Sequence, residues 1–314
     1  MTRLTHMGPL VWTQPAPGSP EAFREDEFVS LWSEMYVLLL KLNFWRREDV
    51  VFPPENTGRH TNLDRHHLRV ELGMSPEAVS LIERLPYPRI APYKRMRIFP
   101  EADAMNYLEW DDLKDCRDPQ DMAHYSTRAS NMSDSSYLLP QDVALARPDE
   151  SDGLACILDI DYNAFRFIHG VLETPARGCD DLPQNYPIER PEDPDHYRNW
   201  PTYHAPTVLR RWIQDLLDLE VVPASIQGEY WNFPSDVQGQ VIIKALRRYG
   251  WPASFREQDW ARDSKEIFRA ASDVTERYEK SFDPHKFGRD RDELLSQWRE
   301  DADLIPYVGL DLSE

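Results

Sequence analysis

The apolar residues of this chain recur at helical spacing near its start and again in its last third. Between Phe28 and Leu42 they predict an amphipathic helix with one strongly apolar face. The same spacing predicts further helices over residues 207–218, 235–249, 254–282 and 290–303, and Gly250 is the expected C-cap of the second of these.

Two short helices are predicted between these regions by their capping residues. Asn62 is the candidate N-cap of a helix that stops at Gly73, since glycine readily takes the left-handed conformation at a helix end. Ser75 precedes Pro76 and an early acid, which is a common start signal, and this second helix ends at Pro86.

The middle third of the chain changes to strand patterns. Strands are predicted over residues 137–146, 153–159 and 163–169, and a short polar break at 161–163 predicts that the last two pair as a hairpin. Seven prolines in residues 174–206 predict a long, semi-rigid connection. Helices, then strands, then helices favour an α+β fold with a small, mostly antiparallel sheet.

The chain is expected to form one domain behind a short arm. Residues 1–18 contain three prolines and no acid, which is typical of an N-terminal arm. The apolar share of 41% is enough for a core over residues 19–314. We therefore predict a single α+β domain over that range, since one core extends to about 250–300 residues.

The charge of the chain limits its partners. It has 36 Lys and Arg against 55 Asp and Glu, a net charge of −19, which excludes a general nucleic-acid coat and argues against DNA. The three cysteines are scattered, which favours a reducing compartment. Apolar runs such as Val37 to Leu40 are far shorter than a membrane span, and no secretory signal is recognised, so we expect a soluble, cytoplasmic protein without a membrane partner.

An acidic cluster is the first candidate for chemistry, because the strong sequence motifs of hydrolases, phosphate-binding loops and zinc proteases are missing from the sequence. Asp111, Asp112 and Asp115 share a face if this stretch is a helical turn. With the nearby Glu109 they would suit a divalent cation or an arginine guanidinium. The alternative is a solvated acidic turn.

A basic segment, residues 84–97, is the least expected local feature of so acidic a chain. It holds five basic residues and no acid, interleaved with two tyrosines. Basic and aromatic side chains together suit a single-stranded RNA end, through phosphate contacts and stacking. The alternative is that these cations neutralise acids of the protein itself. The five are Arg84, Arg89, Lys94, Arg95 and Arg97.

Two smaller clusters are also candidates. His60, Asp64 and His67 follow the spacing of one helical face, and two histidines with a carboxylate are a known ligand set for non-haem iron. A cap at Asn62 would leave His60 outside the helix, so ordinary surface histidines are the alternative. Ser126, close to His124, is a candidate nucleophile, with a flexible serine-rich loop as its alternative.

Several stretches of the sequence resemble a family widespread in filamentous fungi, over about residues 31–260. They read FPPENTGRHTN, LGMSPEAVSLIERLPYPR, SSYLLPQDVALARPDESDGLACILDID and APTVLRRWIQDLLDLEVVPAS. The strand portion is also similar to the SMI1/KNR4 domain, a protein-binding α+β fold. More specifically, the chain resembles the fungal arginine-containing cyclodipeptide synthases. Their acidic DDxxE-type motif is matched by Asp111, Asp112 and Asp115, with Asp where that motif has Glu.

The synthase resemblance implies a transferase of fungal specialised metabolism. Such an enzyme joins arginine to a second amino acid, with arginyl-tRNA and a second aminoacyl-tRNA as partners and no cofactor. The residues implied are Asp111, Asp112 and Asp115 for catalysis, Glu109, His124 and Ser126 for substrate binding, and the basic segment for tRNA. The alternatives are a non-catalytic SMI1/KNR4-like interaction module and a metal-dependent tailoring enzyme that uses the two histidines and the carboxylate named above.

Overall fold

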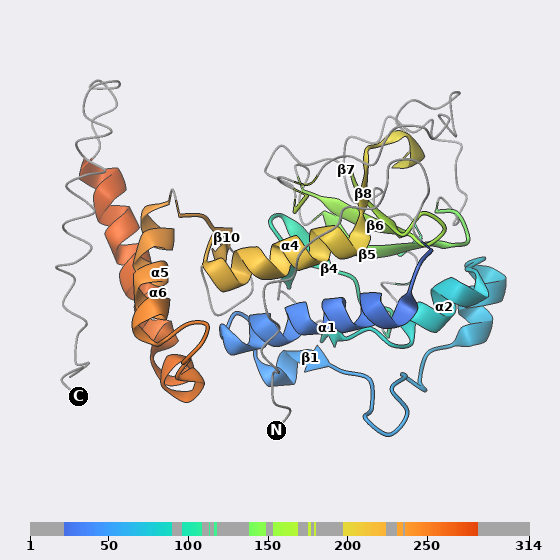
Figure 1. The fold of residues 1–314 in the computed structure, drawn as a ribbon, viewed down its shortest axis with the longest axis horizontal. Helices are drawn as coiled ribbons and strands as arrows, with labels where there is room; N and C mark the ends of the chain where they lie inside the picture. The colour runs from blue at the N-terminus through green and yellow to red at the C-terminus, as the bar shows by residue number, and fades with distance from the viewer. Residues whose placement is uncertain are drawn as a thin grey trace.

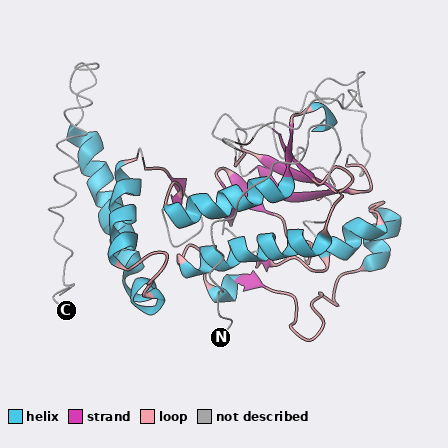
Figure 2. Cartoon of the chain, viewed as in Figure 1, coloured by secondary structure: helices cyan, strands magenta, loops and turns pink. Residues whose placement is uncertain are grey.

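The fold is α+β, as the sequence predicts, and its centre is an antiparallel sheet (Figures 1 and 2). A computed structural model describes residues 22–89, 96–108, 113, 116–117, 138–148, 153–168, 175–176, 179, 197–223, 231–234 and 236–281. The sheet has six strands in the order β3-β4-β5-β6-β7-β8, so each strand pairs with its neighbour in the chain. The strands are β3 (Arg97–Phe99), β4 (Ala102–Ala104), β5 (Asp142–Pro148), β6 (Ala155–Asp159), β7 (Ala164–Ile168) and β8 (Thr202–His204).

The predicted hairpin is confirmed. Strands β6 and β7 pair antiparallel, with Asp159 opposite Ala164 across the turn. Three strands of the sheet were not predicted from the sequence. The sequence did not predict β3 and β4, which begin inside and just after the basic segment. Strand β8 lies within the predicted proline-rich connection, between Pro201 and Pro206. The flanking prolines are tolerated because β8 is at the edge of the sheet, where a missing N–H breaks no hydrogen bond between central strands.

Five helices are described. They are α1 (Glu25–Lys41), α2 (Pro76–Ile82), α4 (Ala205–Asp218), α5 (Val237–Arg248) and α6 (Glu257–Ser281). Four of the five predicted long helices therefore form, with shifted ends, and the fifth, over 290–303, lies outside the described residues. Three short helical turns are also described: η1 (Arg47–Asp49), η2 (His67–Glu71) and η3 (Tyr197–Asn199). Two small antiparallel sheets pair β1 (Val50–Val51) with β2 (Tyr87–Pro88), and β9 (Val222–Pro223) with β10 (Trp231–Asn232).

Helices α1 and α4 run side by side against the sheet (Figure 1). Phe28 of α1 packs edge-on against Phe165 of β7, and Trp212 of α4 packs against Phe99 of β3. These rings are buried, so the apolar faces predicted from the sequence supply the core. Helices α5 and α6 stand together at the end of the molecule away from the sheet (Figure 1).

The caps explain where the short helices begin. Ser75 Oγ accepts a hydrogen bond from the Ala78 amide at 3.1 Å, which confirms the predicted N-cap of α2. The predicted cap at Asn62 is wrong. Asp64 Oδ1 instead accepts from the His67 amide at 3.0 Å, because the helical residues begin later and Asp64 lies three residues before that donor.

Gly250 follows α5 as predicted. Its φ of +84° is left-handed, and a Cβ there would lie 2.3 Å from the Ser254 carbonyl oxygen, so only glycine fits. Across the described parts of the chain, no helix is long and apolar enough to cross a membrane.

Candidate functional site

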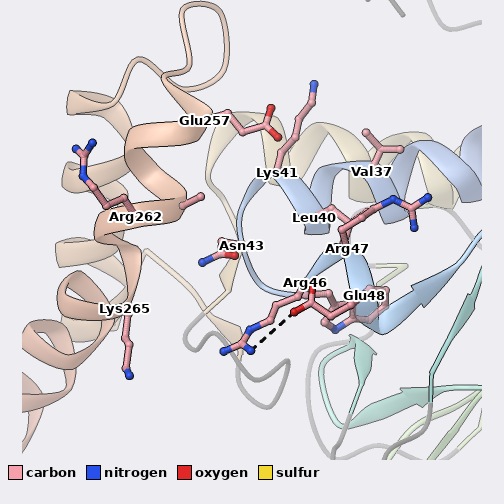
Figure 3. A pocket seen from close by; sticks show the side chains of 12 residues that line it. Val37, Leu40, Lys41, Asn43, Arg46, Arg47, Glu48, Glu257, Arg262 and Lys265 are labelled. Carbon is pink, nitrogen blue, oxygen red and sulfur yellow. Dashed lines mark ion pairs between the residues drawn. The ribbon is translucent and has the colours of Figure 1, made fainter. Parts of the chain in front are cut away.

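A cleft of about 630 Å³ opens where the end of α1 and the turn after it meet α6 (Figure 3). We call it the α1–α6 cleft. One wall consists of Val37, Leu40 and Lys41 from α1, together with the turn that leads into η1. The opposite wall belongs to α6 and includes Arg262 and Lys265. The cleft therefore joins parts of the chain that are far apart in the sequence.

Two hydrogen bonds connect the two walls of the cleft. Asn43 has a positive φ of 55°, a conformation that asparagine tolerates better than most residues, and it turns the chain after α1. Its Nδ2 donates to Ser264 Oγ of α6 at 2.7 Å. The buried indole of Trp260, also on α6, donates to the Leu42 carbonyl at 2.8 Å. The turn is thus fixed to α6 at Leu42 and at Asn43.

Basic residues outnumber acidic ones in the lining of the cleft, although the whole chain carries a charge of −19. The lining includes five cationic side chains and two carboxylates, those of Glu48 and Glu257. Arg262 is held by its own helix, through bonds to Asp259 at 3.0 Å and to Asp263 at 2.8 Å. The remaining four cations are more available to a ligand.

Those four cations differ in how firmly they are held. Arg46 lies 3.9 Å from Glu48 in a loose pair between exposed side chains, drawn as a dashed line in Figure 3. Arg47 donates to the Val50 carbonyl at 3.1 Å and covers the Phe52 ring. Lys41 and Lys265 form no ion pair with any residue that the structure describes. Two ammonium groups and a loosely held guanidinium are therefore open to an anion.

The cleft also offers an apolar surface. Trp45 lines it as a fully buried side chain, so its indole is not accessible to a ligand. Among the described residues, Val37 is one of two large apolar side chains that are exposed, at 38%, and Leu40 and Ala261 also line the cleft. The lining therefore suits a ligand that is both anionic and partly apolar.

A second group of charged side chains lies in the sheet and is shielded from solvent. Arg198 of η3 donates to both carboxylate oxygens of Asp142, at 3.0 and 2.7 Å, and to Asp159 at 2.7 Å. Arg166 of β7 adds a bond to Asp159 at 3.1 Å. The two carboxylates are fully buried. We call these four residues the buried ion network; it ties η3 to β5, β6 and β7.

Burial decides the direction of the pKa shift of Asp142 in this network, whereas the carboxylates decide that of Arg198. Burial and the nearby Asp159 raise the pKa of Asp142 to about 7, although Arg198 acts to lower it. The same carboxylates raise the pKa of the Arg198 guanidinium against the effect of burial, so this arginine stays charged. Tyr197 donates its hydroxyl to Asp142 and accepts from the Leu139 amide at 2.8 Å. The hydrogen bonds of the network are made inside the protein, which indicates a structural role.

The predicted catalytic and substrate residues lie outside the described part of the chain. The same holds for two members of the basic segment, so these assignments stay predictions. The residues concerned are Glu109, Asp111, Asp112, Asp115, His124, Ser126, Lys94 and Arg95.

The described members of the basic segment are partly engaged inside the protein. Arg84 bonds to Glu25 at 2.8 Å and lies 2.7 Å from Asp26. Arg97 is 7% exposed and bonds to Glu101 at 3.0 Å. At these two positions the cations neutralise acids of the protein, which was the alternative interpretation. The side chain of Arg89 is exposed and remains a candidate for RNA contact.

The proposed metal ligands do not come together. His60 is buried, and its Nε2–H donates to the Leu85 carbonyl at 2.9 Å. Its pKa is lowered, mainly by burial. His67 Nδ1 lies 3.0 Å from Glu71, and Asp64 caps the turn. No group of three or more His, Cys, Asp and Glu that could hold a metal ion occurs within the described ranges, so the metal-dependent alternative has no ligand set there.

Sequence reasoning did not find the α1–α6 cleft. Lys41 and Lys265 belong to no motif, and nothing in the sequence marks them as two cations of one cleft. Comparison with known proteins adds no relative: no protein-family model or curated protein matches the sequence, and no solved structure matches the fold.

Proposed function

We propose that the protein is a non-catalytic interaction module of the SMI1/KNR4-like kind, and that it binds a protein partner through the α1–α6 cleft. The observation that carries this proposal is the pair of lysines, Lys41 and Lys265, which border an open cleft without forming ion pairs in the described structure. In a chain of charge −19, cations left open beside apolar surface favour an external anionic partner.

A protein partner fits the lining better than RNA does. Recognition of single-stranded RNA depends on exposed rings that stack with bases. The ring that lines the cleft, Trp45, is fully buried, whereas the exposed apolar group is the aliphatic Val37. Arg84 and Arg97 are also bonded to carboxylates of the protein. The interaction module, an alternative at the level of sequence, therefore becomes the leading proposal.

The proposal is tested by purifying the tagged protein from its native cells after RNase treatment, and by rebuilding the complex from purified components. We expect one protein partner at a fixed stoichiometry in size-exclusion chromatography with light scattering. Co-purification of RNA alone, or a partner that does not bind when both proteins are pure, would contradict it.

The aminoacyl-tRNA-dependent synthase is the second candidate, with a cytoplasmic location expected for both. Its support is the exposed Arg89 together with the open cations of the cleft, which would also suit phosphates. Charged tRNAs are incubated with the purified protein, and the products are searched for cyclo-Arg-Xaa by mass spectrometry. Binding should weaken with salt, with a slope of roughly −0.7 per contacted phosphate. No product with any amino acid rejects this candidate.

A further inference from the structure

We infer that the α1–α6 cleft takes an acidic peptide segment, with a carboxylate at each cationic end and an aliphatic side chain between them. This inference rests on the proposed interaction function and names the chemistry of the partner. It follows from the arrangement of charge and apolar surface along the cleft.

The three most open cations stand apart from one another. In Figure 3, Lys41 stands at one rim near Glu257, whereas Arg46 and Lys265 lie toward the other. Leu40 lies at an intermediate height, beside Arg47, whose side chain is already held by the Val50 carbonyl and the Phe52 ring. An extended chain repeats its side chains on one face every second residue, so acid, apolar and acid positions can alternate along such a surface. The spacing of charge and apolar surface therefore matches a peptide more closely than one compact anion.

The carboxylates of the lining select against a dense polyanion. Glu257 lies at the Lys41 end and Glu48 is paired with Arg46, so each end carries one acid of its own. A phosphate chain would place repeated charge beside both acids, which is repulsive. A single carboxylate at each end meets a lysine or arginine and avoids that crowding.

Arg46 is suited to exchange its partner. Its pair with Glu48 is long, at 3.9 Å, and the side chains are 56% and 71% exposed, so the pair contributes little. A peptide carboxylate can form two parallel bonds with the same guanidinium, which is the stronger geometry. Lys265 adds a second cation from the opposite wall.

The test measures fluorescence polarisation with a short labelled peptide that has Glu, Leu and Glu at every second position, with Ser between them, so that the three side chains share one face. We expect saturable binding by the full chain, and a loss of affinity on the order of tenfold or more in the Arg46→Glu, Lys265→Glu double variant, because like charges then meet. The same peptide with Gln in place of Glu should bind weakly. Arg69→Glu, which reverses an exposed cation on η2 outside the cleft, is the matched control and should bind as the parent does.

Absence of peptide binding by the parent chain, or equal binding by the double variant, overturns the inference. Tighter binding of a labelled single-stranded RNA that the double variant abolishes also overturns it, in favour of RNA.

The inference and the proposed function can fail separately. A reconstituted partner complex that survives the double variant would leave the interaction module intact and reject the cleft as its site. Peptide binding in the cleft without any protein partner would keep the ligand chemistry and reject the interaction module.

Discussion

The buried ion network and the α1–α6 cleft use the same kinds of side chain in opposite ways. In the network, Arg198 bonds two carboxylates that are both fully buried. In the cleft, Arg46 faces Glu48 across 3.9 Å, and the two lysines stay unpaired within the described structure. Burial requires each charge to have partners, because an unpaired buried ion is very costly. Exposure removes that requirement, so surface cations can remain available to a ligand.

The two regions also shift carboxylate pKa values in opposite directions. Burial raises the pKa of Asp142, in the network, to about 7. Beside the cleft, the bond from Arg262 lowers the pKa of Asp263. Both carboxylates bond to an arginine, so the pairing alone does not decide the direction. The loss of solvation does, and it is complete only for Asp142.

Removing the shared arginine of the network should have the largest effect. Arg198→Leu removes the guanidinium that bonds the buried Asp142 carboxylate, and it removes one of the two arginines that bond Asp159 in the described structure. We expect unfolding to become easier by about 3–5 kcal/mol, measured by urea denaturation. Arg262→Leu removes a more exposed arginine from two carboxylates and is the control, with only a small expected effect. An equal loss of unfolding free energy in the two variants would show that the buried and the exposed arginine stabilise the fold to the same extent, which contradicts the comparison.

The pH dependence should distinguish the same two carboxylates. The folded pKa of Asp142 is raised above its unfolded value, so its contribution to stability is present at low pH and is lost as the pH rises toward about 7. The folded pKa of Asp263 is lowered, so its contribution is present above its ordinary pKa of 3.8 and is lost as the pH falls. Carboxyl carbon NMR shifts followed against pH give both midpoints.

The Asp142→Asn variant sharpens that test. It keeps the side chain uncharged at every pH, so the fall in stability between about pH 4 and pH 7 should be reduced. An Asp142 midpoint below that of Asp263 would show that pairing outweighs burial.

Removing the open cations of the cleft should have the smallest effect on stability. Lys41→Gln and Lys265→Gln each lose a charge that has no ion pair in the described structure. We expect the free energy of unfolding to stay within about 0.5 kcal/mol of the parent value in urea denaturation. A loss comparable to that of Arg198→Leu would mean that these lysines stabilise the fold and are not held open for a ligand.

The sequence determined the parts of this protein that depend on neighbouring residues. The helix from Phe28, the cap at Ser75 and the β6–β7 hairpin were predicted because periodicity and turn chemistry act over a few positions. The Asn62 cap was wrong for a local reason as well, since two capping residues lie close together and backbone geometry selected Asp64.

Only the tertiary structure decided which charges are open. Nothing near Arg97 in the sequence shows that its side chain is buried, and nothing near Lys41 shows that α6 stands across from it. Exposure and pairing depend on which distant segments pack together, and here Trp260 and Ser264 bring α6 to the end of α1. A basic residue can be identified in a sequence, whereas its freedom to bind a partner is set by the fold around it.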